Sequence, residues 1–250
     1  MPIETSIIIR TRNEEKWLGR ILEMLFSQTY KDFEVIIVDS ESTDKTLEIA
    51  RRFSVKILNI PYKDFSYPYA LNYGVRNSNA SRYVVIMSAH SLPVSETWLA
   101  DGLKNFSQQK NILGVYGFIR ALPGSTFWDK FFLDGSYWLR GLRYGPGNNG
   151  TYIVDKSGMG VMGFTNAIIL KELWLKRQFN ENYGLGGEDE EWANYWLVRG
   201  HRAVRDTKFT VRHSHGLGLY GWCRQFKYWS STKNPQPFKR LPFRRDPTHS

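Results

Sequence analysis

The sequence predicts an α/β fold built around a mostly parallel central sheet. In the first ninety residues, short β-branched runs alternate with segments whose apolar residues recur at helical spacing. This alternation is typical of a doubly wound sheet, in which helices connect parallel strands and cover both faces. The chain has 250 residues, of which 42% are hydrophobic and 15% aromatic. It is therefore long and apolar enough to bury the core of such a fold.

The first two strands are predicted at residues 6–10 (SIIIR) and 34–38 (EVIIV), because both runs are short and apolar, as buried parallel strands are. An apolar stripe at helical spacing predicts a helix between them. The stripe consists of Trp17, Leu18, Ile21, Leu22, Leu25 and Phe26. The next helix is predicted to begin near Ser42 or Thr43, either of which can act as its N-cap.

The same reasoning predicts further strands at residues 55–58, 82–87, 112–120 and 202–211. Further helices are predicted at residues 70–77, 165–178 and 190–198. Residues 141–163 contain too many glycines for a helix and are predicted to form a loop.

Ligands of doubly wound sheets bind beyond the carboxyl ends of the strands, so the residues that directly follow the strands are candidates for a site. They are Arg10, Thr11, Arg12, Asn13 and Glu14 after the first strand, Asp39 after the second, and Ser88, Ala89 and His90 after residues 82–87. Taken alone, Asp39 is better explained as a turn or helix-capping residue than as a ligand-binding one. Together, a carboxylate able to hold a base or ribose and two guanidiniums able to hold phosphate favour a nucleotide site.

Residues 183–192 (YGLGGEDEEW) place three glycines directly before four consecutive carboxylates. Glycine lets backbone come close to a ligand, and acids are favoured at the start of a helix by its dipole. The motif alone is equally well explained as an acidic first turn of a helix. The residues around it favour a functional site.

Three segments resemble the inverting family-two glycosyltransferases of GT-A fold. The first is SIIIRTRNEEKWLGRILEMLFSQTYKDFEVIIVDSESTDKT, the second is ALNYGVRNSNASRYVVIMSAHSLP, and the third is GGEDEEW followed by RHSH. The GGED and RHS pieces are also similar to those of metal-dependent β-galactosyltransferases. The resemblance reaches about residue 215 and implies a Rossmann-like GT-A fold that transfers a sugar, with inversion, from a nucleoside diphosphate.

The resemblance also implies a role for each matching position. Asp39 would hold the base or ribose of a UDP-, GDP- or dTDP-linked donor, with Arg10, Thr11, Arg12 and Glu14 lining the same pocket. Asp189 would be the catalytic base, and Glu188 would orient the acceptor. Gly186 and Gly187 would let backbone approach the donor sugar.

The metal site is where this chain departs from the pattern, because Ser88, Ala89 and His90 stand where the family has a DxD motif. Imidazole is a good ligand for Mn²⁺-like or softer ions, so His90 with His213 or His215 is expected to complete a divalent site for Mn²⁺ or Mg²⁺. The alternative is that His90 only donates a hydrogen bond. Arg10, Arg12 or cations of the C-terminal segment would then neutralise the leaving diphosphate.

Basic charge is concentrated near the C-terminus. Residues 201–250 hold eleven of the 34 Lys and Arg residues and two of the 24 acids. We divide the chain into a domain at residues 1–220 and a basic aromatic extension at residues 221–250. Its aromatic residues interleave with cations, as in segments that lie on anionic membranes or bind acidic polymers. A solvated helix explains the pattern equally well. We expect the extension to serve attachment to a membrane or a lipid-linked acceptor more than folding.

The predicted function is that of an inverting glycosyltransferase acting on a hydroxyl of a glycan or lipid-linked acceptor, in surface polysaccharide biosynthesis. The alternative is a non-catalytic GT-A-like protein that binds a membrane or an acidic polymer through its tail. A nucleotidyltransferase would need a glycine-rich loop with a lysine after the first strand, which RTRNEEKW lacks, and no motif supports nucleic-acid binding. With one cysteine, no signal peptide and no long apolar run, we expect a cytoplasmic protein, with the inner face of the membrane as an alternative location.

Overall fold

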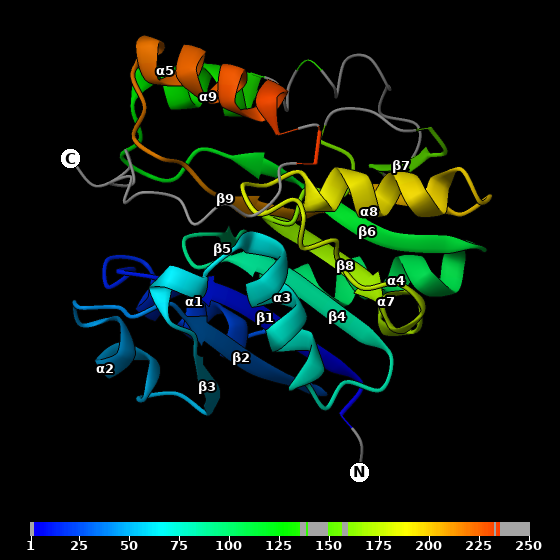
Figure 1. Ribbon diagram of the computed structural model, residues 1–250, viewed down its shortest axis with the longest axis horizontal. Coiled ribbons are helices and arrows are strands. Elements are labelled where there is room, and N and C mark those ends of the chain that lie inside the picture. Colours follow the sequence, from blue (N-terminus) through cyan, green and yellow to red (C-terminus); the bar gives the residue numbers. More distant parts are fainter. Residues whose placement is uncertain (1–2, 136–138, 140–149, 157–159, 233, 236–250) are drawn as a thin grey trace.

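A curled central sheet with helices on both faces forms the body of the molecule in the computed structural model (Figure 1), which describes residues 3–135, 139, 150–156, 160–232 and 234–235. The described strands are β1 (Thr5–Thr11), β2 (Phe33–Asp39), β3 (Val55–Asn59), β4 (Tyr83–Ser88), β5 (Leu92–Pro93), β6 (Ile112–Arg120), β7 (Thr151–Val154), β8 (Asn166–Leu170) and β9 (Arg202–Arg212). The described helices are α1 (Leu18–Phe26), α2 (Thr46–Ala50), α3 (Tyr67–Arg76), α4 (Trp98–Gln108), α5 (Phe127–Asp129), α7 (Lys171–Lys176), α8 (Glu188–Leu197) and α9 (Leu219–Ser231). Two short helical segments complete the set, η1 (Tyr62–Asp64) and η2 (Lys130–Asp134).

The strand order across the sheet is β3-β2-β1-β4-β8-β6-β9-β5, and β7 pairs with β9. The four strands of the first ninety residues, β3, β2, β1 and β4, are parallel to one another. Strand β8 enters antiparallel between β4 and β6, and β6 and β9 are again parallel. The predicted α/β class is therefore confirmed, and the carboxyl ends of β1, β2 and β4 lie at one edge of the sheet.

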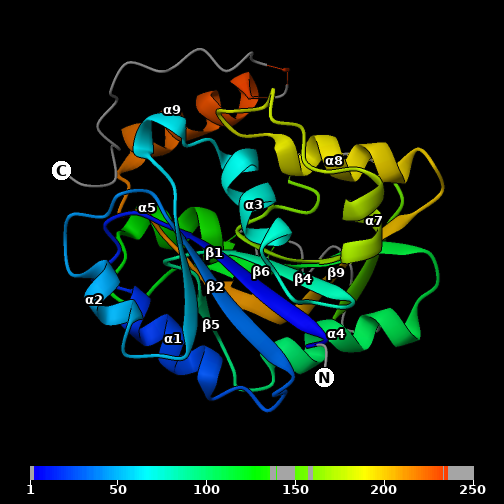
Figure 2. The ribbon, with the colours of Figure 1, turned by 60° about the horizontal axis from the view of Figure 1, so that its bottom comes forward.

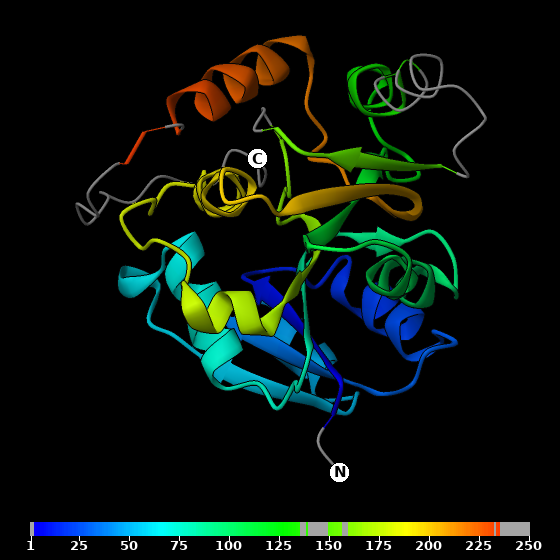
Figure 3. The same ribbon diagram turned by 90° about the vertical axis from the view of Figure 1, so that its right-hand side faces the viewer.

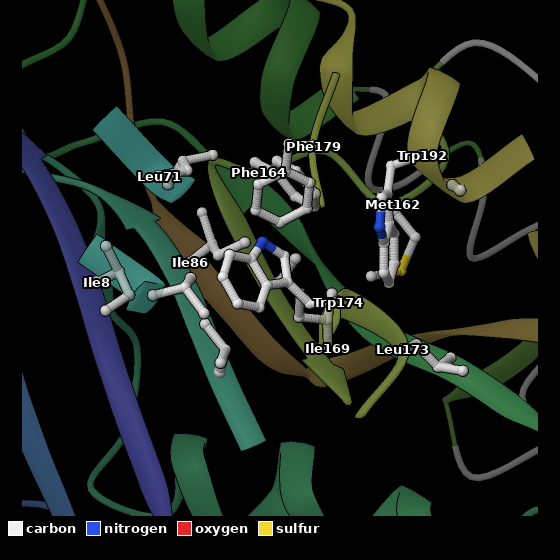
Figure 4. Close-up of a cluster of buried hydrophobic side chains, with 14 of the residues drawn as sticks. Ile8, Leu71, Ile86, Met162, Phe164, Ile169, Leu173, Trp174, Phe179 and Trp192 are labelled. Carbon is white, nitrogen blue, oxygen red and sulfur yellow. The ribbon is translucent and has the colours of Figure 1, made fainter. Parts of the chain in front are cut away.

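Helices cover both faces of the sheet (Figures 2 and 3). Apolar side chains fill a layer between the sheet and the helices on each face. Both layers receive side chains from the same strand, because successive side chains of a strand point to opposite faces. In β1, Ile8 points into the layer beneath α3, α7 and α8. Ile7 and Ile9 point into the layer beneath α1 and α4. Trp174 and Trp192 lie in the first of these layers (Figure 4) and are at most 2% exposed. Burying a large apolar side chain contributes roughly 1.5–3 kcal/mol, so this double layer holds the edge of the sheet in a fixed geometry.

The helix predicted at residues 165–178 is wrong in its first half, which is strand β8. Ala167, Ile168 and Ile169 are 0% exposed because β8 pairs with β4 on one side and β6 on the other and is covered on both faces. A short apolar run fits a buried strand or a buried helical turn equally well, and only the pairing partners decide. The rest of the predicted helix is the short α7.

The elements that were not predicted include α4, the two-residue strand β5, β7 and the short helical segments α5, η1 and η2. Strand β7 lies inside the predicted glycine-rich loop, where residues 151–154 pair antiparallel with β9. The other parts of that loop at residues 141–149 and 157–159 lie outside the described residues.

Helix α9 crosses the predicted boundary at residue 220 and packs on the domain. Trp222 is only 3% exposed, and its indole Nε1 donates a hydrogen bond to the buried Asp129 at 2.9 Å. The expectation that residues beyond 220 contribute little to folding is therefore wrong for this part of the extension. Residues 236–250 lie outside the described residues, and the division at residue 220 stays a prediction. Among the described residues, no helix combines the length and apolarity that crossing a bilayer requires.

Candidate functional site

The register of the parallel strands brings the candidate residues together. Thr11 is paired with Asp39 across β1 and β2, and Arg10 is paired with Ser88 across β1 and β4. The loops that follow these three strands therefore leave the sheet side by side, as predicted. Backbone bonds tie them further, since the Ser40 N–H donates to the Thr11 carbonyl at 3.0 Å.

Asp39 is 1% exposed, and both of its carboxylate oxygens accept hydrogen bonds from Ser42. The Ser42 hydroxyl donates to Oδ1 at 2.5 Å and its backbone N–H donates to Oδ2 at 3.0 Å. The same hydroxyl accepts from the Asn13 N–H at 2.9 Å, and Asn13 has a φ of 55°. Asp39 thus shapes the loop after β2 and connects it to the loop after β1, and its contact with a base or ribose stays a prediction.

Arg10 and Arg12 reach the same edge and rest on tyrosines. The Arg10 guanidinium lies 4.8 Å from the centre of the Tyr67 ring, and that of Arg12 lies 3.3 Å from the centre of the Tyr62 ring. Arg12 Nε and Thr11 Oγ1 are buried without a hydrogen-bond partner among the described residues. A buried donor that has no partner costs free energy, so these groups are suited to an anionic ligand such as phosphate.

The glycine–acid motif forms the start of α8. Gly187 precedes the helix in a left-handed conformation, with a φ of 91°. A Cβ at this position would collide with the carbonyl oxygen of Thr232, just after α9. Gly187 therefore lets α9 pack against this loop, a reason that the sequence did not reveal. The predicted approach of Gly186 and Gly187 to a donor sugar stays a prediction.

Glu188, which is buried, and Asp189, which is half-buried, form a pair of carboxyl groups that faces Arg10. Arg10 Nη1 lies 3.5 Å from Glu188 Oε1. Asp189 accepts hydrogen bonds from the backbone N–H groups of Glu190 at 2.8 Å and Phe164 at 3.3 Å. These contacts hold Asp189 in one orientation at the first turn of α8.

Burial, and then the neighbouring charge of Asp189, raise the pKa of Glu188 to about 8, and Arg10 opposes this shift. Burial also raises the pKa of Asp189, against the effect of its two hydrogen bonds. Two carboxyl groups this close share the cost of ionisation, so the pair holds a proton more tightly than exposed acids do. A group that takes up a proton near neutral pH is what general base catalysis requires.

His90, His213 and His215 form a cluster in which one ring nitrogen of each lies within 4.8 Å of the others. Strand β5 explains why, since Leu92 pairs with Arg212 and so brings the residues before β5 beside those after β9. The rings of His90 and His213 are stacked, with centres 4.3 Å apart. The predicted candidates for metal ligation are therefore brought together, although they are 125 residues apart in the chain.

Hydrogen bonds at the Nδ1 atoms orient His90 and His213. Glu14 Oε1 lies 2.8 Å from His90 Nδ1, and Ser91 Oγ lies 3.2 Å from His213 Nδ1. A carboxylate at Nδ1 favours the tautomer that carries its proton there and leaves Nε2 as a free base. His90 Nε2 is buried without a hydrogen-bond partner among the described residues, and His213 Nε2 lies 3.1 Å from His215 Nε2.

These features suit a divalent cation. Burial, followed by the charges of His90 and His215, holds the pKa of His213 well below its usual value. The neutral imidazole is the form that ligates a metal. An oriented ring nitrogen without a hydrogen-bond partner, such as His90 Nε2 among the described residues, can donate its lone pair to a metal ion. Because Glu14 contacts His90, it supports the cluster from outside. Its predicted place in the donor pocket stays a prediction.

Known proteins that are similar to this chain include glycosyltransferases. The model of the family described as glycosyl transferase family 2 matches residues 6–174. The sequence is 32% identical over 128 residues to the dolichyl N-acetyl-α-D-glucosaminyl phosphate 3-β-D-2,3-diacetamido-2,3-dideoxy-β-D-glucuronosyltransferase of Methanococcus voltae. That match covers 47% of this chain and 39% of the relative.

Solved structures show a similar fold. The mannosyltransferase PcManGT of Pyrobaculum calidifontis, in complex with GDP-Man and Mn²⁺, matches with a TM-score of 0.63 at 19% identity. TarS 1-349 of S. aureus, in complex with UDP, matches with a TM-score of 0.62 at 15% identity. They match over 90% and 92% of this chain, and over 60% and 65% of their own length. The chain thus spans less than two thirds of each relative, and these structures support the GT-A fold.

Proposed function

Because this chain belongs to glycosyl transferase family 2, we propose that it is an inverting glycosyltransferase that moves a sugar from a nucleoside diphosphate to an acceptor hydroxyl. One observation carries the proposal. The short segment from Arg10 to Glu14 contacts the carboxyl pair through Glu188 at one end and the histidine cluster through His90 at the other. The candidate base and the candidate cation site would therefore flank the same segment, an arrangement that suits transfer from a diphosphate.

The donor nucleotide would lie over the carboxyl ends of β1 and β2. Asp39 would accept hydrogen bonds from the base or ribose, while Thr11 and Arg12 would supply their unpartnered donors to the diphosphate. Stacking on Tyr62 fixes the guanidinium of Arg12 before the donor arrives, so less entropy is lost on binding.

Asp189 would be the general base. The acceptor oxygen would attack the anomeric carbon from the face opposite the diphosphate, giving its proton to Asp189 as the bond to the diphosphate oxygen breaks. The electron pair of that bond leaves with the diphosphate, and Glu188 would orient the acceptor. Arg10 balances the charge of the pair and is held in place by Tyr67.

His90, His213 and His215 would hold a divalent metal ion, for which Mn²⁺ in the PcManGT structure is support from a similar fold. A bound ion would stabilise the charge that develops on the leaving diphosphate. Glu14 and Ser91 would keep the ligating nitrogens of His90 and His213 deprotonated and aimed at the ion.

The acceptor would be a glycan or a lipid-linked sugar, and the reaction would serve surface polysaccharide biosynthesis. The Methanococcus voltae relative, whose name includes a dolichyl-linked phosphate, supports the lipid-linked alternative.

The stereochemistry of the product tests the proposal. The purified chain would be incubated with UDP-, GDP- and dTDP-linked α-sugars and a set of glycan and lipid-linked acceptors, and the product would be examined by proton NMR. We expect a β-linked product formed together with one nucleoside diphosphate. An α-linked product would show a retaining enzyme and would remove Asp189 from the role of base.

A further inference from the structure

A continuous row of aromatic side chains, which we call the aromatic strip, runs across α5, η2 and α9. Its members are Phe127, Phe131, Phe132, Phe226 and Trp229. Successive ring centres are 6.2, 5.2, 5.4 and 5.6 Å apart, so each ring contacts the next. The strip joins two segments that are almost a hundred residues apart in the sequence.

Most of the strip is in contact with water. Phe127 is 69% exposed, Phe131 57%, and Phe226 and Trp229 are 38% and 39% exposed. Single exposed apolar residues are ordinary, but a contiguous row of large rings marks a surface that binds something apolar.

The strip is held rigidly from beneath. Trp222 lies on the inner side of α9, where its ring centre is 5.0 Å from that of Phe132 and its Nε1 donates to Asp129 at 2.9 Å. Asp129 also accepts hydrogen bonds from the backbone N–H groups of Gly216 and Leu217, which lead into α9. The two helical segments are therefore fixed to each other, and the exposed rings are not fraying ends.

Cations accompany the rings, and free acids are absent from these elements. Lys130 on η2 and Arg224 and Lys227 on α9 are exposed. Of the two acids within residues 127–135, Asp129 is buried and Asp134 is paired with Arg120 at 3.1 Å. Helix α9 contains no acid at all.

We propose that the aromatic strip is a docking surface for an anionic lipid bilayer. Exposed aromatic rings beside exposed Lys and Arg match the two layers of a lipid interface, since the rings enter the boundary of the acyl chains and the cations remain at the headgroups. A second copy of the chain fits less well, because a symmetric contact would place the cations of one copy against those of the other.

Docking at the strip would bring the bilayer next to the carboxyl pair. The C-terminal end of α9 contacts the glycine loop, where the Tyr228 hydroxyl donates to the Leu185 carbonyl and Thr232 lies against Gly187. A lipid-linked acceptor could then reach Asp189 from the membrane surface. This second step rests on the proposed function, whereas binding of the strip to lipid does not.

Vesicle flotation without donor or acceptor tests the proposal. The whole chain would be mixed with vesicles of phosphatidylcholine alone or with phosphatidylglycerol. The wild-type chain is expected to float with the anionic vesicles and to be released by high salt. Phe127→Ser with Phe131→Ser is expected to lower binding by roughly tenfold or more, because two phenylalanines no longer leave water. Lys130→Glu with Lys227→Glu is expected to abolish the preference for anionic vesicles.

The matched control is Leu175→Ser with Val198→Ser, which removes two apolar side chains that are 65% and 69% exposed on α7 and after α8. We expect it to bind vesicles like the wild type, and all variants to keep their melting temperature. Absence of binding by the wild-type chain would overturn the proposal, as would equal loss in the control. Unchanged binding in the phenylalanine variant, with a change of oligomeric state instead, would overturn it in favour of a contact between copies.

Discussion

Arg10 Nη1 lies 3.5 Å from Glu188 Oε1, and these side chains are only 12% and 5% exposed. The contact joins the carboxyl end of β1 to the first turn of α8, two elements that the resemblance assigns to the donor and the acceptor. Because the pKa of Glu188 is raised to about 8, this carboxyl group is largely protonated at neutral pH. Arg10 then balances the charge of Asp189 across the pair.

The raised pKa of Glu188 makes stability depend on pH. Between the ordinary pKa of a glutamate, about 4.3, and the folded value of about 8, the unfolded chain loses this proton first. The favourable contribution of protonated Glu188 to the free energy of unfolding is therefore complete below that range and is lost as pH rises to 8. Glu188→Gln mimics the protonated form, so its free energy of unfolding should improve relative to the wild type between pH 5 and pH 8. Urea denaturation of both proteins across this range measures the difference, and a constant difference would contradict the assignment.

Asp189→Asn should lower turnover by about 10² or more, since losing a general base typically costs 10²–10⁴-fold. Donor binding should stay close to that of the wild type, because the change keeps the size of the side chain. Glu190→Gln is the matched control, as it makes the same change one position further along α8. Steady-state rates and donor dissociation constants separate the two effects. A larger loss in Glu190→Gln would move the base to that residue.

Glu14→Gln should weaken metal binding by about tenfold or more, in the range typical of carboxylates that orient a ligating histidine. The reason is the 2.8 Å contact of Glu14 Oε1 with His90 Nδ1. Glu15→Gln is the control, because Glu15 accepts a hydrogen bond from the backbone N–H of Lys45 and not from a histidine of the cluster. Calorimetric titration with Mn²⁺ in the absence of donor measures the affinity directly. Equal affinities in the two variants would show that Glu14 does not act on the metal site.

Trp222→Ala should lower the free energy of unfolding by about 3–5 kcal/mol, as expected for removing a fully packed tryptophan. It would also leave Asp129 with one hydrogen bond fewer. Trp229→Ala, on the same helix but 39% exposed, should cost under about 1 kcal/mol. Chemical denaturation of both variants gives the comparison. Similar small costs would show that α9 does not contribute to the folded domain.

Local patterns were sufficient to predict the first half of the fold. Short apolar runs and helical stripes predicted β1, β2, β4 and the helices between them, and the parallel register then placed Arg10 and Asp39 at one edge. The second half could not be predicted as well because β8 is defined by its two neighbours. The run NAIIL carries no periodicity of its own that distinguishes a strand from a helix.

The resemblance predicted the histidine cluster. It did not predict the strand β5 or the contact with Glu14 that hold the cluster in place. The strand that aligns His90 with His213 has only two residues and includes a proline, so no pattern indicated it. The contact of Glu14 with His90 depends on side-chain directions in loops, and the contact of Arg10 with Glu188 depends on where the start of α8 lies relative to the end of β1. Strand and helix periodicities encode neither. From the sequence, we interpreted Gly187 as a residue that lets the backbone approach a ligand. In the structure, the absence of a side chain at Gly187 leaves room for the backbone of Thr232.

We propose that the carboxyl ends of β1, β2 and β4 bind a nucleoside diphosphate with the help of a metal. Melting temperatures measured with UDP, GDP and dTDP, each with and without Mn²⁺, test it most directly, since a ligand that binds only the folded state raises the melting temperature. At a ligand concentration about a hundred times the dissociation constant, we expect one nucleotide to raise it by about 5 °C or more in the presence of Mn²⁺, and much less in His90→Ala. No shift with any nucleotide, or a shift that is unchanged by Mn²⁺ and by His90→Ala, would show that this edge of the sheet does not bind a nucleotide with a metal.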